Sequence, residues 1–361
     1  MRLAMLLFLL PMTAIAAGQV PRDLPGNGKC PGCMLDGADL AGRNLAGADL
    51  SGASLRGANL QGAILFKALL SEADLRGANL LNASMGQADL SGANLEGVNL
   101  PGARLARSKL IGANFANASL QEANLDAADL TQADFSNADL SGSLMTNALL
   151  VDTDLTGANL SDAKLRLIDF TGVAAITGAD CRGALLYKAR FSGLELTQVR
   201  FDGANLQSAD FTDTDLRSSS FSGAELGDAV MNGADMRGAD LRGSRLKGAR
   251  LSGARLEQAR LSGAELGGNL VEMDFSAADL RFANFSGANL KAARFVNADL
   301  ERALFPEANL YGADFTGANL EGASFVKANL VNASFDKANL DGVNFRQARG
   351  RPVQVDAYPE D

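Results

Sequence analysis

Apolar residues recur every five positions from Leu35 to Phe345, and this period dominates the chain. The local pattern is small–Asp/Asn–Leu/Phe–x–Gly, as in the unit 38–42, which reads ADLAG. We number the central apolar residue of each unit i, and all 63 central positions are apolar. A period of five fits neither the 3.6-residue turn of an α-helix nor the two-residue alternation of a plain strand.

A chain that turns a corner once per unit accounts for this pattern. Residues i−2 and i face inward, whereas i−1, i+1 and i+2 face water. Ala dominates i−2 because two inward residues share each side of a narrow tube, and only one of them can be large. Asp and Asn suit i−1, where their short side chains can bond local backbone groups. Gly at i+2 relieves backbone strain at the bend.

The units resemble the A(D/N)LXX motif of the pentapeptide-repeat family over residues 33–346. The resemblance implies an all-β fold, a right-handed quadrilateral parallel β-helix with four units per coil. Its 63 units then form about 16 coils, a rod roughly 75 Å long at about 4.8 Å per stacked strand. One buried Leu or Phe contributes roughly 1.5–3 kcal/mol, so we expect a stable rod that needs no cofactor.

Two irregular steps divide the repeat into segments of 28, 19 and 16 centres. A six-residue step leads from Phe170 to Ile176 through residues 171–176, and a four-residue step leads from Leu266 to Leu270 through 267–270. Both are too short to form protruding functional loops. We expect bulges or kinks at these two places.

The interior composition changes toward the C-terminal end. From Phe275 to Phe345 the centres alternate Phe and Leu without exception. With four units per coil, each Phe should stack on the Phe 20 residues later, on two opposite interior faces. An aromatic ligand groove is the alternative, but 15 of the 18 Phe occupy centres, which favours core packing. Cys181 is also a centre, so we expect a buried free thiol.

The N-terminal residues have the layout of a secretory signal peptide. Arg2 is followed by the apolar run Leu3–Ile15 and a small-x-small site, so residues 1–16 are predicted to be cleaved, with Ala17 as the mature start. The run is too short to span a bilayer. We therefore expect an exported, periplasmic protein with a lead-in at 17–32, the repeat at 33–346 and a tail at 347–361.

Composition excludes several functional classes. The chain carries 33 Lys+Arg against 42 Asp+Glu, which disfavours nucleic acid and anionic membrane as non-specific partners. His is absent, so the commonest general base and metal ligand are unavailable. A convex rod also offers no concavity that could desolvate paired carboxylates. We expect no enzymatic activity and no metal site.

Cys30 and Cys33 form a CxxC sequence just before the first full repeat. In an exported protein a disulfide is plausible, and it would restrain the chain where the first coil exposes an unpaired edge. Inert thiols are the alternative. A thioredoxin-like role lacks the βαβ pattern, zinc lacks ligands, and covalent haem lacks the His after Cys33, where Met34 stands.

Charge is the one surface feature that could carry recognition. Between residues 111 and 163 there is no Lys or Arg, while eight carboxylates give −8. The sign then reverses in a belt in which four arginines occupy i−1 on successive sides. A solvated surface that keeps the rod soluble is one interpretation, and a docking site for an acidic protein or an anionic envelope component is the other. The candidate interaction belt comprises Arg237, Arg242, Arg245, Lys247, Arg250, Arg255 and Arg260.

Two functional hypotheses follow. The first is an exported, non-enzymatic scaffold or protein-interaction rod of the bacterial envelope, with partner and oligomeric state open. The second comes from the resemblance: some family members mimic B-form DNA and protect type II topoisomerases, which the acidic stretch 111–163 would suit. The predicted export signal, the belt, and the lack of a protruding loop or helical C-terminal dimerisation segment count against the second.

Overall fold

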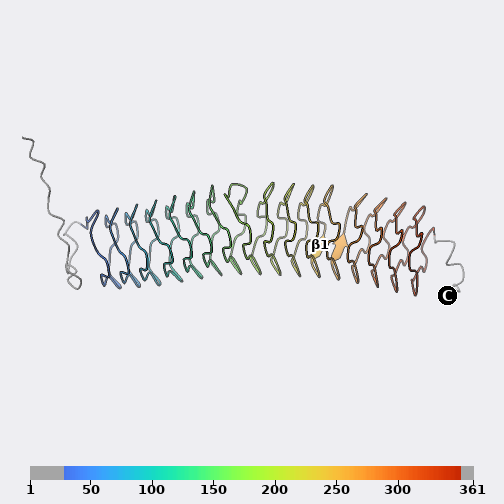
Figure 1. Cartoon of the computed structure of the whole chain (residues 1–361), viewed down its shortest axis with the longest axis horizontal. Coiled ribbons are helices and arrows are strands. Elements are labelled where there is room, and N and C mark those ends of the chain that lie inside the picture. The colour runs from blue at the N-terminus through green and yellow to red at the C-terminus, as the bar shows by residue number, and fades with distance from the viewer. Residues whose placement is uncertain (1–27, 351–361) are drawn as a thin grey trace, which may run out of the picture.

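The computed structural model describes residues 28–350, which form one elongated rod (Figure 1). The predicted signal peptide, most of the lead-in and residues 351–361 of the tail lie outside the described residues. Within the described part, no helix is long and apolar enough to cross a bilayer.

Parallel bridges between residues 20 apart build the rod. Successive examples are Met34 with Ser54, Asp39 with Asn59, and Asn44 with Ile64. Four consecutive five-residue units therefore lie on four sides of one coil before the chain returns above its start. We call these sides 1 to 4, beginning with the units centred on Leu35, Leu40, Leu45 and Leu50. The predicted all-β repeat solenoid is confirmed.

Continuous strands are short in this architecture. In the described residues only β1 (Arg245–Lys247) and β2 (Glu265–Gly267) extend over three residues, and they pair in parallel with Arg245 opposite Glu265. Elsewhere each side consists of one bridging residue followed by a two-residue turn. A corner every five residues leaves no room for a longer strand.

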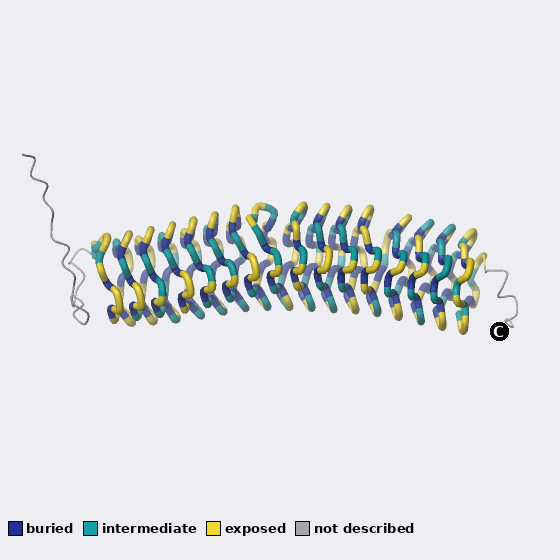
Figure 2. The backbone as a smooth tube through the Cα atoms, viewed as in Figure 1, coloured by how far each residue is buried: buried dark blue, intermediate teal, exposed yellow. Residues whose placement is uncertain are grey.

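The interior follows the five-residue pattern. Leu and Ala at i and i−2 are almost entirely buried, and exposed residues lie mainly along the outer corners (Figure 2). Residue i+2 adopts a left-handed conformation, as at Gly92 (φ 66°), and Lys67 does so as well (φ 57°). Glycine adopts this conformation without steric cost, which explains its preference at i+2, while many corners accept another residue.

Two aromatic columns fill the C-terminal part of the core. Phe275 stacks on Phe295 at 5.2 Å between ring centroids, and Phe285 stacks on Phe305 at 4.9 Å. The columns face each other, because Phe285 meets Phe295 edge to face at 5.9 Å and 85°. These are favourable arrangements for aromatic pairs. The predicted stacking of each Phe on the Phe 20 residues later is confirmed.

Side chains at i−1 bond the turn that follows them. The Asp134 carboxylate accepts the amide of Ser136 at 2.8 Å, and the Asp154 carboxylate accepts that of Thr156 at 2.8 Å. Asn also links coils: Asn309 Nδ2 donates to Asn289 Oδ1 at 3.0 Å. Asp and Asn therefore satisfy turn amides that the parallel ladder leaves unpaired.

The two irregular steps change the bridge spacing locally. Asp154 pairs with Ala175 at a separation of 21, and the six-residue step makes a widened corner in the green part of the ribbon (Figure 1). Arg260 pairs with Asp279 at a separation of 19 after the four-residue step. The spacing returns to 20 beyond each step, so the rod absorbs both without changing its architecture.

Candidate interaction surface

The four i−1 arginines of the predicted belt lie on one coil. Their bridge partners in the preceding coil are consecutive i−1 residues, Glu225, Val230, Asp235 and Asp240, on sides 3, 4, 1 and 2. The structure therefore places Arg245, Arg250, Arg255 and Arg260 around the rod.

Carboxylates of the same chain lie beside most of these guanidinium groups. Arg245 is 3.1 Å from Glu225 and 3.8 Å from Glu265. Arg255 lies 3.2 Å from Glu257. The same pattern holds for Arg260, which is 3.4 Å from Asp240. Three of the four belt arginines are thus already partly compensated.

Arg237 and Arg242 belong to a recurring Asp-x-Arg arrangement. In each, the guanidinium at i+1 folds back onto the carboxylate at i−1 of its own unit, with Arg237 2.5 Å from Asp235 and Arg242 2.6 Å from Asp240. Hydrogen bonds from the Arg237 guanidinium hold the pKa of Asp235 below its usual value. Partial burial of Asp240 opposes the effect, but bonds from Arg242 still lower its pKa.

Lys247 and Arg250 differ from the rest of the belt. Within residues 28–350 neither has a carboxylate within 4.0 Å. They occupy the corner between sides 3 and 4, at i+1 and i−1 of successive units. Their charges are therefore the most available ones in the belt for an external anion.

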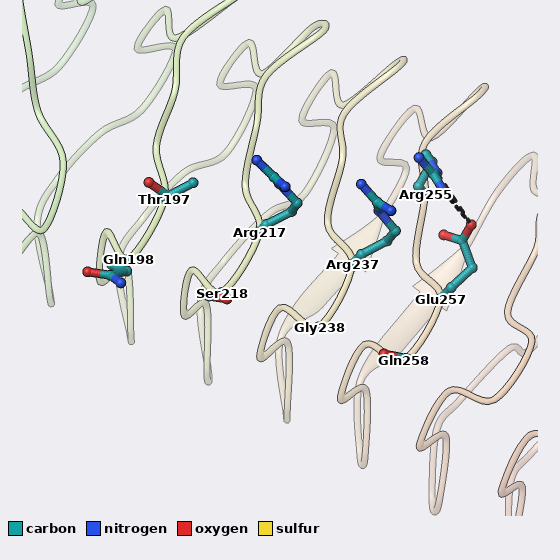
Figure 3. A pocket seen from close by; sticks show the side chains of 9 residues that line it. All are labelled: Thr197, Gln198, Arg217, Ser218, Arg237, Gly238, Arg255, Glu257 and Gln258. Carbon is teal, nitrogen blue, oxygen red and sulfur yellow. Dashed lines mark hydrogen bonds and ion pairs between the residues drawn. The ribbon is translucent and has the colours of Figure 1, made fainter.

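A shallow groove of about 730 Å³ runs along side 1 next to the belt (Figure 3). Arg217 and Arg237 lie parallel on adjacent coils, and Arg255 reaches toward Glu257 (Figure 3). Parallel guanidinium groups suit carboxylate or phosphate ligands, although each here is already paired with an acidic side chain. The groove also contains Thr197, Gln198, Ser218, Gly238 and Gln258.

The four-residue step next to the belt interrupts the backbone ladder. Arg250 and Arg255 bridge only to the preceding coil. Among the described residues, the amides of Leu251 and Leu256 have no backbone acceptor in the following coil, unlike Leu261, which donates to Asp279 at 2.7 Å. The belt thus lies where the coils are joined by fewer hydrogen bonds.

The cysteines occupy separate places. Cys30 and Cys33 are joined by a disulfide with a Cα–Cα distance of 5.4 Å, at the N-terminal end of the first coil. Cys181 is a buried free cysteine in the core, as predicted. Burial raises the pKa of the Cys181 thiol strongly, so it stays protonated and unreactive at neutral pH.

Sequence reasoning missed one group of residues. Leu149, Val151 and Leu167 are the three most exposed large apolar side chains in the described part, at 55%, 51% and 61%. They occupy i−1, i+1 and i+2, positions that the repeat assigns to water. That mismatch is visible in the sequence and could have identified them.

Comparisons with known proteins were made at this point. The family model described as Pentapeptide repeats matches successive segments that together cover residues 33–172 and 174–349. A search among curated proteins found no significant match.

Solved structures give partial matches. A trypsin-treated variant of QnrB1, a plasmid-mediated fluoroquinolone resistance protein, is 18% identical over 53% of this chain and 91% of its own, with a TM-score of 0.41. HetL, a pentapeptide repeat protein involved in heterocyst differentiation regulation in the cyanobacterium Nostoc sp. strain PCC 7120, is 27% identical over 75% and 90%, with a TM-score of 0.23. A pentapeptide repeat protein of the Arabidopsis thaliana thylakoid lumen is 32% identical over 35% and 67%, with a TM-score of 0.15.

Proposed function

The chain belongs to the pentapeptide-repeat family, and on that premise we propose that it is a non-enzymatic scaffold rod, exported to the periplasm, that binds an anionic partner. The right-handed sense and about 16 coils expected from the sequence form part of this proposal. One observation carries it: arginines from four successive sides lie on a single coil.

The availability of charge narrows the contact region. Lys247 and Arg250 lack an internal carboxylate, whereas Arg245, Arg255 and Arg260 share theirs. We infer that the partner first contacts the corner between sides 3 and 4 and then competes for the shared arginines. A planar guanidinium can bind a carboxylate or phosphate through two parallel hydrogen bonds.

Charge reversal tests the belt. Arg245, Arg250, Arg255 and Arg260 are changed to Glu, and binding is measured to polyglutamate and to vesicles containing phosphatidylglycerol. We expect at least about tenfold weaker binding, because four attractive contacts become repulsive. The matched control reverses Arg294, Arg302, Lys327 and Lys337, which changes net charge equally. Equal losses in both variants would reject the belt, and the probe that binds separates a protein-like from a lipid source of the anion.

Export is tested by fractionating cells that express the native chain and sequencing the mature N-terminus. A periplasmic product beginning near Ala17 is expected. An uncleaved cytoplasmic product would reject the envelope role.

A topoisomerase-binding DNA mimic is the second candidate. The acidic stretch favours it, because its carboxylates are distributed over all four sides with no Lys or Arg between residues 111 and 163. Protection of a type II topoisomerase from an inhibitor by micromolar purified protein would support this candidate. Unchanged supercoiling and inhibition would remove it. The eight carboxylates are Glu122, Asp126, Asp129, Asp134, Asp139, Asp152, Asp154 and Asp162.

A further inference from the structure

An exposed apolar patch lies near the middle of the rod, beside the six-residue step. Leu149 and Val151 flank Leu150 on side 4, and Leu167 lies at the corner of sides 3 and 4 in the next coil. Tyr187 extends the patch one coil further on side 3. We call these four residues the mid-rod patch.

The fold does not require apolar residues at these positions. Elsewhere i−1 is usually Asp or Asn, i+1 is often Ser or Thr, and i+2 is often Gly. Leu167 has a φ of 59°, a left-handed conformation that costs a non-glycine residue roughly 1 kcal/mol. The patch therefore exposes apolar surface and adds strain without supporting the core, which is typical of a binding surface.

The backbone ladder is also interrupted beneath the patch. In the described residues the amides of Asn147 and Leu150 have no backbone acceptor in the next coil, whereas the equivalent amides of Ala127 and Leu130 donate to Thr146 and Leu149. This part of sides 3 and 4 is the least tightly joined stretch on that half of the rod.

Charges on sides 3 and 4 change sign about the patch. Six consecutive coil segments on these two sides carry net charges of +3, −2, −1, +1, +2 and −2 in chain order. A two-fold axis between the third and fourth segments pairs +3 with −2, −2 with +2 and −1 with +1. The segments are 104–112, 124–132, 144–152, 164–172, 185–193 and 205–213.

Most of these charges lack a partner within the chain. Lys109 lies 3.8 Å from Asp89, and Arg190 lies 2.7 Å from Asp169. No other charged side chain of the six segments has an opposite charge within 4.0 Å inside residues 28–350. The unpaired groups are Arg104, Arg107, Asp126, Asp129, Asp152, Lys164, Arg166, Lys188, Asp210 and Asp213.

From these observations we propose that the mid-rod patch binds a second copy of this chain, with the two rods antiparallel and side by side. An isologous interface must be self-complementary, and the sign reversal about the patch provides this. A parallel pair would place each charged segment opposite its own copy and repel. The flat sides of two rods can approach closely, so the four apolar residues of each copy become the centre of the interface and the charges its rim.

Sedimentation of the full chain tests the dimer, with protein from about 1 µM to about 200 µM. The key variant is Leu149→Asn, Val151→Ser and Leu167→Gly, which gives each position a residue common in the repeat. It should fold at least as stably as the parent and dimerise at least about tenfold more weakly. The matched control is Phe282→Gly, an exposed apolar i+2 residue on side 2 with a φ of 59°, which should leave dimerisation unchanged.

Charge swapping tests the antiparallel orientation. Asp126→Lys with Asp129→Lys should abolish dimerisation, because two cationic segments then face each other. Adding Lys188→Asp and Arg190→Asp to the same chain should restore it, since the facing segments are again opposite in sign. Higher salt should weaken the parent dimer through screening of the rim charges.

The outcomes separate clearly. A monomeric parent at about 200 µM, an undiminished dimer in the triple variant, or no rescue by the four-residue swap would each overturn the proposal. Loss of dimer in the triple variant together with rescue by the swap would establish both the surface and its orientation.

Discussion

The two irregular steps produce opposite surfaces from similar backbone defects. The six-residue step at 171–176 adds a residue and lies beside exposed Leu149, Val151 and Leu167. The four-residue step at 267–270 removes one and lies beside the arginine belt. At both places amide groups on two sides lose their acceptors in the next coil.

The difference shows where a uniform repeat can carry information. Regular coils display nearly the same Asn, Asp, Ser and Gly side chains on every side, so one coil is hard to distinguish from another. Both candidate interaction surfaces lie next to a step, one apolar and one cationic. We infer that the steps mark positions along the rod, and that the neighbouring side chains decide what binds there.

Core truncation at the six-residue step should have the largest effect. Phe170 is fully buried and stacks on Phe191 at 4.7 Å, so Phe170→Ala should lower the free energy of unfolding by about 3–5 kcal/mol. Repeat proteins are stabilised through contacts between neighbouring coils, so urea unfolding should also split into two transitions. Leu270→Ala is the counterpart at the four-residue step, at about 2–5 kcal/mol. A single unshifted transition in both variants would show that neither step limits cooperativity.

Hydrogen exchange should detect both ladder interruptions. We expect the amides of Asn147, Leu150, Leu251 and Leu256 to exchange at least about tenfold faster than that of Leu130, because Leu130 donates to Leu149 at 2.9 Å. Mass spectrometry of overlapping peptides measures this in the unmodified protein. Uniform protection along the rod would contradict the account of weakened coil contacts at the steps.

A buried hydroxyl distinguishes the two regions by about 1 kcal/mol. Ser143, near the six-residue step, has a buried Oγ without a hydrogen-bond partner, whereas the Oγ of Ser244, near the belt, donates to the Leu241 carbonyl at 2.7 Å. Ser143→Ala should stabilise the protein by about 1 kcal/mol because an unsatisfied polar atom is removed. Ser244→Ala should bring no such gain. Thermal unfolding of both variants provides the comparison.

The smallest effect concerns pH and the Asp-x-Arg pairs near the belt. Arginine hydrogen bonds hold the pKa values of Asp215 and Asp235 below the ordinary 3.8. Their contribution to stability is therefore present above pH 3.8 and is lost as the pH falls further, through the lowered folded-state values. Thermal unfolding from about pH 5 to about pH 2 should show a smaller decrease for Asp215→Asn with Asp235→Asn than for the parent. Identical decreases would contradict this assignment.

The sequence predicted what depends on the five-residue period alone. The buried centres, the stacked Phe and the buried Cys181 follow from position within the unit, and the structure confirms them. Pairing of charges depends on residues 18 to 21 positions away and on side-chain rotamers. For that reason the belt appeared uniform in sequence, although Arg245 lies beside Glu225 and Glu265 while Arg250 has no such neighbour.

The mid-rod patch shows the same limitation. Leu149 and Leu167 are separated by 18 residues and meet only because the chain returns every 20 residues to the same side. Assigning residues to sides beyond the six-residue step requires the 21-residue separation that the bridges reveal. The alternation of charge along sides 3 and 4 becomes visible only with that assignment.

The left-handed corner residue has a consequence for how such a rod can change over time. In the described part, i+2 is occupied by Gly or by residues such as Lys67, Glu72, Asn82 and Phe282, but never at positive φ by Val, Ile or Thr. Branching at Cβ is the main steric restriction at that site. Each coil therefore offers four outward sites at which substitution alters the exterior while leaving the tightly packed interior untouched. Such a molecule can acquire and lose partners faster than it can alter its shape.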